Sequence, residues 1–187
     1  MRIRVTTLRR AAAWAAILGL ATALAARAEA EHKYIGASKC AMCHKSEAKG
    51  NQYGVWLKSM HAKAYETLAG AAALKIGKEK GLDKPPQQND ACLKCHVTGW
   101  GKPATAFEAT FKKEDGVSCE SCHGPGSDYK SINVMKDRAA AVGAGLVVPD
   151  EKVCTQCHNK ESPSYKPFVF KEYAAKIAHP NPQKTGK

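Results

Sequence analysis

Four strings of one pattern hold the residues of this chain whose types and spacing could do chemistry. In each string two cysteines stand three positions apart, and a histidine directly follows the second cysteine. The cysteines are Cys40, Cys43, Cys92, Cys95, Cys119, Cys122, Cys154 and Cys157, and the histidines are His44, His96, His123 and His158. The strings therefore use all eight cysteines of the chain and four of its seven histidines.

This spacing predicts attachment of c-type haem. In a helical turn the positions i, i+3 and i+4 lie on one face. Two thiols so placed can add to two vinyl groups on one edge of a porphyrin, and the histidine then lies beneath the ring centre, where it binds iron. The same string is the sequence signature of c-type haem attachment. We therefore expect four c-type haems, with the cysteines as thioether anchors and the four histidines as proximal iron ligands.

Three other uses of paired cysteines compete with this interpretation. Structural zinc ions held by two cysteine pairs each, disulfide bonds and redox-active dithiols can all use cysteines at this spacing. None of them requires a histidine at the next position every time. Histidine is otherwise rare, since only His32, His61 and His179 lie outside the strings. Haem attachment is therefore the interpretation that we adopt.

The net charge fits the same cofactor. The chain carries a formal charge of +12, and residues 1–30 contribute +4 of it, from five arginines and one glutamate, which leaves +8. The propionates of four haems would largely balance that charge. A basic chain can also bind nucleic acid, but no basic run here is interleaved with aromatic residues as single-strand binding requires. We do not expect nucleic acid as a partner.

Residues 1–30 have the pattern of a secretory signal peptide. Four arginines precede a short apolar run that ends in small residues, with cleavage expected after Ala28 or Ala30. A retained membrane anchor is the alternative, but the run is at the short end for crossing a bilayer. We expect an exported protein of the periplasm, without stable membrane insertion after cleavage. The outer surface of the cell and the extracellular medium stay open as locations.

The expected fold class is mainly α with long irregular loops: a compact multihaem cytochrome c organised around four covalently attached haems. Residues 31–187 should form this single tetrahaem domain, with roughly forty residues per haem, too few for a separate protein core. The patterns predict helices over residues 52–76, 138–146 and 170–178. No alternating apolar pattern predicts a substantial sheet.

The second axial position of each iron is short of histidines. Electron-transfer haems usually take His or Met there, and only three histidines remain for four irons. His61 and His179 are the first two candidates, and His32 and Met135 compete for a further position. At least one iron is therefore methionine-ligated or open. An open iron could bind nitric oxide or another small molecule, so it permits enzyme chemistry as well as electron transfer.

Several segments around the strings resemble the tetrahaem cytochrome c-554 family. They are "YIGASKCAMCHKS", "WLKSMHAKAYETL", "CLKCHVTGWG" and "VSCESCHGPG", and the resemblance covers most of residues 34–126, returning at "CTQCH" and His179. It implies a mostly helical periplasmic electron carrier with haems packed in close pairs. It also implies that His61 binds the haem of the fourth string, and that His179 binds the haem of the third.

The resemblance further implies a five-coordinate haem on His96, next to "VTGWG". One departure matters for the first haem, on His44. Where the family has a histidine soon after "CHGPG", this chain reads "SDYKSINVMKD". His32 or Met135 is then left to bind that iron, and if neither does, two irons are open.

Two classes of function follow from these residues. The first is a periplasmic electron carrier between a redox donor and a redox acceptor protein, with surface lysines suited to transient docking on an acidic partner. The alternative is a small haem enzyme that reduces nitric oxide, hydroxylamine or peroxide at the open iron. Such an enzyme needs a proton donor at that iron. Asp90 and Glu120 lie near strings in the sequence, but no pattern directs either toward an iron. We therefore favour the carrier.

Overall fold

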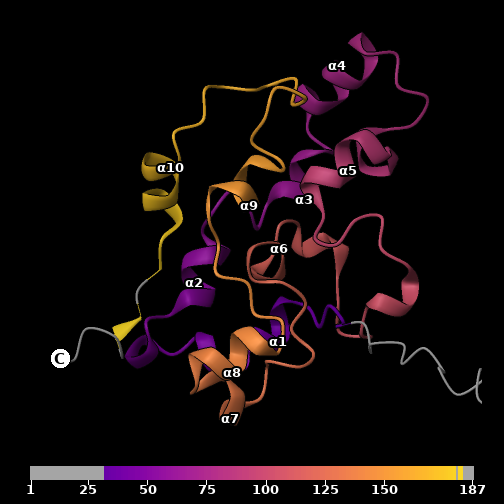
Figure 1. Cartoon of the computed structure of the whole chain (residues 1–187). Coiled ribbons are helices and arrows are strands. Elements are labelled where there is room, and N and C mark those ends of the chain that lie inside the picture. The colour runs from indigo at the N-terminus through magenta and orange to yellow at the C-terminus, as the bar shows by residue number, and fades with distance from the viewer. Residues whose placement is uncertain (1–31, 180, 183–187) are drawn as a thin grey trace, which may run out of the picture. The chain divides into compact units, whose positions relative to one another are not determined.

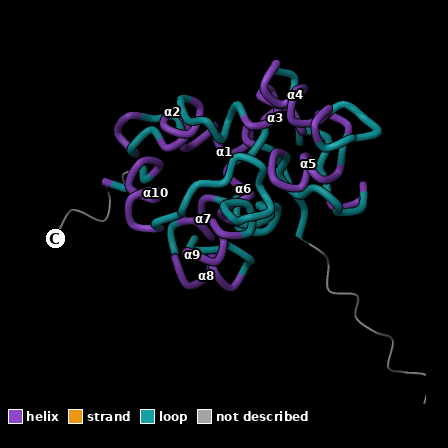
Figure 2. The backbone as a smooth tube through the Cα atoms, turned by 90° about the horizontal axis from the view of Figure 1, so that it is seen from above, coloured by secondary structure: helices purple, strands orange, loops and turns teal. Residues whose placement is uncertain are grey.

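Short helices joined by long loops make up this protein (Figures 1 and 2). The computed structural model describes residues 32–179, 181 and 182; the expected signal peptide lies outside the described residues. The α-helices of the described part are α1 (Ala37–His44), α2 (Gln52–Leu57), α3 (Ala64–Thr67), α4 (Ala71–Glu79), α5 (Asp90–His96), α6 (Cys119–His123), α7 (Ile132–Met135), α8 (Arg138–Gly143), α9 (Glu151–Thr155) and α10 (Phe170–Ile177). Among these residues the only β contact is one isolated parallel bridge between Tyr34 and Phe107. The expectation of a mainly α fold with long loops is confirmed.

The single helix predicted over residues 52–76 is wrong, because α2, α3 and α4 divide this segment. The first interruption contains His61, whose carbonyl oxygen accepts the backbone N–H of Val117 at 3.0 Å. Gly116 comes so close that a Cβ there would lie 2.8 Å from this oxygen. In a continuous helix the same carbonyl would accept from the residue four positions on. A long-range contact therefore overrides the local helix preference.

The other two expected helices are confirmed. α10 ends one residue before the predicted limit, and α8 begins where predicted and ends three residues early. The side chain of Asp137 caps the start of α8, accepting the N–H groups of Ala139 at 2.8 Å and Ala140 at 3.0 Å. Shortly beyond its end, Gly145 has a φ of +96°, a left-handed conformation that a helix cannot continue through.

Apolar side chains form only a small core in the described part. Leu68, Leu93 and Val97 make a buried cluster that joins the turn after α3 to α5. Ile35 and Ala37 are buried at the start of α1. No helix among the described residues is both long enough and apolar enough to span a lipid bilayer. The protein's own apolar packing therefore holds only parts of the fold together.

A buried carboxylate ties α6 to the segment that enters α1. Glu120 is 2% exposed, and its carboxylate accepts backbone N–H groups from Ile35, Gly36 and Gly126, each at 2.8 Å. Burial raises the pKa of Glu120, and the three N–H donors oppose that shift. The segment that enters α1 and the loop just after α6, which are far apart in the sequence, therefore meet on one side chain.

Replacing this carboxylate should destabilise the fold. We expect Glu120→Gln to lower the free energy of unfolding by about 2 kcal/mol, because hydrogen bonds to charged groups contribute about 1.5–3 kcal/mol and an amide nitrogen cannot accept one. Urea unfolding of the mature protein, followed by far-UV circular dichroism, measures the change. Glu114→Gln, at an exposed position, is the control and should stay within about 0.5 kcal/mol of wild type. Equal stabilities for both variants would contradict the role of Glu120.

Candidate haem-binding sites

Each of the four strings lies on a helical turn. α1, α5 and α6 end at the histidine of a string. The fourth string begins in α9 and continues into the next turn, where the N–H of His158 donates to the carbonyl of Cys154 at 3.0 Å. All eight cysteines are free of disulfide bonds. Each string therefore presents two free thiols and a histidine on one face, which fits the attachment of one porphyrin.

In three strings the Nδ1 atom of the histidine is held by an oxygen acceptor. His44 contacts the side-chain oxygen of Gln52 at 3.1 Å, His96 the carbonyl of Ala64 at 2.6 Å, and His123 the carbonyl of Val147 at 3.1 Å. A carbonyl oxygen only accepts hydrogen bonds, so Nδ1 carries the proton and Nε2 keeps its lone pair. This is the arrangement by which proteins orient histidine ligands of metals.

Two histidines from outside the strings face histidines within them. The rings of His61 and His158 have centroids 6.0 Å apart with 66° between their planes, and His123 and His179 lie 6.0 Å apart at 67°. Two nitrogen–metal bonds of about 2 Å each, with the ring radii added, span about this separation. Both pairs therefore have the spacing of two axial ligands on one metal ion.

Burial favours the neutral imidazole at one histidine of each pair, His61 and His123. Burial, and then the neighbouring His158, lowers the pKa of His61 below its ordinary value. Burial likewise lowers the pKa of His123, with the nearby His179 and His44 adding to the effect. Only the neutral ring offers a lone pair to a metal. These histidines are therefore poised for ligation at neutral pH.

His158 is held by aromatic packing. Its ring stacks on Phe168, with centroids 4.9 Å apart and 20° between the planes, and it also contacts Tyr173. Both aromatic residues come from the C-terminal segment that contains α10. The long segment after the fourth string therefore folds back and holds that string's histidine in place.

Cysteine thiols of different strings lie near one another. Cys40 is hydrogen-bonded to Cys119 and Cys157 to Cys95, and Cys122 lies close enough to Cys154 for that thiol to help raise the pKa of Cys122, after burial. A hydrogen bond to Cys119 raises the pKa of Cys40. Burial raises the pKa of Cys157 to about 12, and the Cys95 thiol adds to the rise. The strings are thus linked in the order first, third, fourth, second, which the spacing along the chain does not reveal.

A large cavity lies among the second, third and fourth strings. Its volume is about 1170 Å³, above the range of about 300–1,000 Å³ for pockets that bind one small molecule. Its walls include Cys92, Cys95, His96, Cys122, Cys154, Cys157, His158 and His61. Thiols and imidazoles from separate strings therefore border one shared space. The residues present fit c-type haem.

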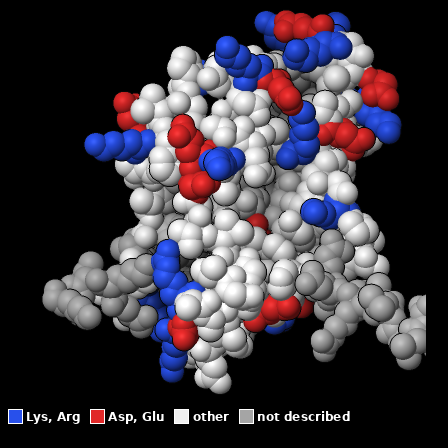
Figure 3. All heavy atoms as spheres, viewed as in Figure 1, with Lys and Arg blue, Asp and Glu red and all other residues white. Residues whose placement is uncertain are grey.

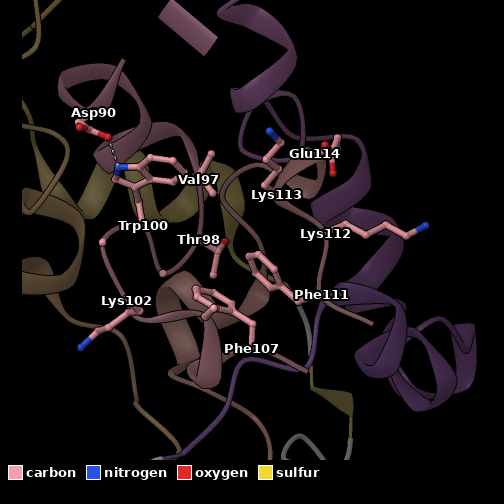
Figure 4. A pocket seen from close by; sticks show the side chains of 13 residues that line it. Asp90, Val97, Thr98, Trp100, Lys102, Phe107, Phe111, Lys112, Lys113 and Glu114 are labelled. Atoms are coloured by element: carbon pink, nitrogen blue, oxygen red, sulfur yellow. Dashed lines mark hydrogen bonds between the residues drawn. The ribbon is translucent and has the colours of Figure 1, made fainter. Parts of the chain in front are cut away.

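A second pocket, of about 700 Å³, is lined by the residues that follow His96 (Figure 4). Phe107 and Phe111 project into it, and the indole N–H of Trp100 donates to Asp90 at 3.2 Å. Thr98, which sequence reasoning did not single out, is buried, and its hydroxyl donates to the Gly116 carbonyl at 2.8 Å. The "VTGWG" segment therefore borders a pocket, and the open iron on His96 stays a prediction.

Both carboxylates considered as proton donors accept hydrogen bonds from other parts of the chain. Asp90 accepts the indole N–H of Trp100, and Glu120 accepts three backbone N–H groups. Both side chains are thus engaged in holding the fold. The enzyme alternative gains no support from them.

The remaining candidates for axial ligands lie in different surroundings. Nδ1 of His32 lies 2.8 Å from a carboxylate oxygen of Asp128. Met135 is half-buried at the end of α7. Met42 and Met60 are 73% and 69% exposed. The assignments of His61, His179, His32 and Met135 as iron ligands stay predictions.

Comparisons with known proteins point to one family. A family model described as cytochrome c554 and c-prime matches residues 39–124. The chain is 31% identical over 153 residues to cytochrome c-554 of Nitrosomonas europaea, which covers 73% of this chain and 63% of that relative, slightly under two thirds of its length. A solved structure of reduced cytochrome c554 from the same organism matches with a TM-score of 0.53 and 27% identity, covering 84% of each chain.

The two histidine pairs can be tested by counting spin states. We expect His61→Ala and His179→Ala each to convert one low-spin ferric iron to high spin, because each removes one axial ligand. Electron paramagnetic resonance of the oxidised holoprotein measures the count. Met60→Ala, next to His61 and exposed, is the control and should leave the count unchanged. An unchanged count in both histidine variants would refute the pairing.

Proposed function

We propose that this chain is a member of the cytochrome c554 family, which it resembles in sequence and fold, and that it carries electrons between a redox donor protein and a redox acceptor protein. Its cofactors are four c-type haems, bound at the four strings. One observation carries the proposal: hydrogen bonds join thiols of the first and third strings and of the second and fourth strings, and a thiol of the third string lies within electrostatic range of one in the fourth. Attachment points arranged in this way suit transfer within the molecule.

The chain's own residues anchor and orient the cofactors. When bound, each haem supplies an iron that accepts and releases one electron. The eight cysteines would fix the rings by thioether bonds, and His44, His96, His123 and His158 would each bind one iron. Backbone and side-chain acceptors at Nδ1 lock three of these imidazoles in place, so the ligands have little freedom to rearrange when the charge on the metal changes.

Residues within a string also connect it to the next string. The Cys40–Cys119 contact joins the first and third strings, and Glu120 holds α6 against the segment that leads into α1. The Cys95–Cys157 contact joins the second and fourth strings. We propose that electrons follow the order first, third, fourth, second, or its reverse.

The partners are proposed from surface charge. Lysine and arginine side chains are scattered over the face shown in Figure 3, and Asp and Glu side chains lie among them. Some lysines are paired, as Lys94 is with Glu161 and Lys130 with Glu108. Scattered cations favour rapid and short-lived encounters with an acidic protein over a permanent complex. Donor and acceptor are therefore proposed to be acidic redox proteins.

The location is proposed to be the periplasm. Covalent haem attachment at cysteine pairs suits an exported chain, and residues 1–30 have the pattern of a secretory signal peptide. The mature protein would begin at Glu29 or Glu31, according to the cleavage site. Mass spectrometry of the exported protein tests the cleavage site and the presence of four haems together.

Electron exchange within the molecule is the decisive test of the carrier role. After a pulse of reductant that delivers less than one electron per molecule, we expect the reduced absorption to redistribute among the haems. The rate of this redistribution should not depend on protein concentration, because the exchange is intramolecular. A dilution series of the holoprotein supplies the control. Redistribution that slows in proportion to dilution, or that does not occur, would contradict the proposal.

A further inference from the structure

Hydrogen bonds hold the segment around His32 in place, although His32 is the first described residue. Lys33, next to it, pairs with Ser127 through its backbone: its N–H donates to the hydroxyl at 2.9 Å and its carbonyl accepts the N–H of Ser127 at 3.1 Å. Tyr34 then donates to the carbonyl of Ala106 at 2.8 Å. Hydrogen bonds to residues far along the chain, Ser127 and Ala106, therefore fix the backbone beside His32.

The imidazole of His32 is oriented by a carboxylate. Nδ1 lies 2.8 Å from Oδ2 of Asp128, whose other oxygen accepts the hydroxyl of Ser127 at 2.6 Å. With Asp128 ionised, Nδ1 donates, and the lone pair of the neutral ring is then on Nε2. A carboxylate that orients a histidine by its Nδ1–H is a common second-shell arrangement at metal sites.

Gly145 makes room for the ring of His32. A Cβ at Gly145 would lie 3.0 Å from Nε2, 3.1 Å from Cδ2 and 3.3 Å from Cε1. These nearly equal distances put the Cβ position over the face of the ring and not ahead of Nε2 in the ring plane. Any Cβ here would push the ring aside by a few tenths of an ångström, and the φ of +96° at this position also favours glycine. The direction of the Nε2 lone pair is therefore not blocked by Gly145.

His32 lies on the side of the fold where the first and third strings meet. The Gly145–Val147 segment binds the third string, since Val147 donates its N–H to the carbonyl of His123 at 2.9 Å. Tyr129, adjacent to Asp128, lies near enough to the Cys40 thiol for that thiol to help raise the pKa of the phenol, after burial. Figure 1 shows α1 and α8 in the lower part of the molecule and α5 in the upper part.

Among the described residues, no histidine ring is paired with His44 at the spacing that joins His123 to His179. His123, in the third string, already faces His179 at 6.0 Å. His44 is close enough to His123 to contribute to lowering its pKa, so both histidines belong to this region. We propose that His32 binds, through Nε2, the iron of the haem on His44, and that Asp128 and Gly145 position it. This inference rests on the proposed haem-carrying function.

Spin counting of the oxidised holoprotein tests the assignment. We expect His32→Ala to add one high-spin iron per molecule, and carbon monoxide binding by the reduced protein to rise by one equivalent. Lys33→Ala, at the exposed adjacent position, is the matched control and should change neither count. Met135→Leu should also change neither. An unchanged count in His32→Ala, or a gain of one high-spin iron in Met135→Leu instead, overturns the proposal.

Two further variants separate ligation from a structural role. His32→Met should keep the iron low-spin and raise one midpoint potential, because a Met/His pair raises the potential of haem. Asp128→Asn should keep the spin count and shift one midpoint potential, since the carboxylate acts through the histidine. Potentials that are unchanged in both variants overturn the proposal even if His32→Ala fails to accumulate.

Mass spectrometry of each variant keeps the two proposals distinguishable. Four haems with an unchanged spin count in His32→Ala would refute only the ligand assignment. Fewer than four haems in the wild-type protein would refute the proposed function and, with it, this inference.

Discussion

The geometry of a single helical turn is the constraint on which the rest of this structure depends. Two thiols and an imidazole must share one face, so each string needs one turn of helix and no more. The described helices are accordingly short, and the loops between them are free to bring strings together. The apolar cluster of Leu68, Leu93 and Val97 is small. Cohesion depends instead on contacts between strings and on polar anchors such as Glu120.

Local chemistry made the strings and several helices predictable from the sequence. The placing of each string on a helical turn and the helix α10 follow from residue spacing within one or two turns. The break in the helix expected over residues 52–76 could not be predicted in this way. The carbonyl of His61 accepts the N–H of Val117, which lies far along the chain. That break moves His61 from a helix face into a turn, where its ring faces His158.

Partners supplied by distant segments could not be read from the sequence. Gln52, Ala64 and Val147 hold three of the string histidines, yet two of these three residues contribute only a backbone carbonyl, which carries no sequence signal. The same is true of the three N–H groups that make Glu120 a structural anchor. A glutamate three residues before a string's histidine suggests acid–base chemistry from its type alone, and only its donors show that it holds the fold.

The acceptors at Nδ1 distinguish the histidines from one another. Neutral oxygens hold His44, His96 and His123, whereas a carboxylate holds His32. An anionic acceptor makes an imidazole a stronger electron donor than a neutral acceptor does, and a stronger donor stabilises the more highly charged metal. Ligation by His32 would therefore lower the potential at the first string relative to a pair with neutral acceptors only. The first string is at one end of the proposed order of strings. A lower potential there would therefore favour electron transfer in one direction, from the first string toward the third.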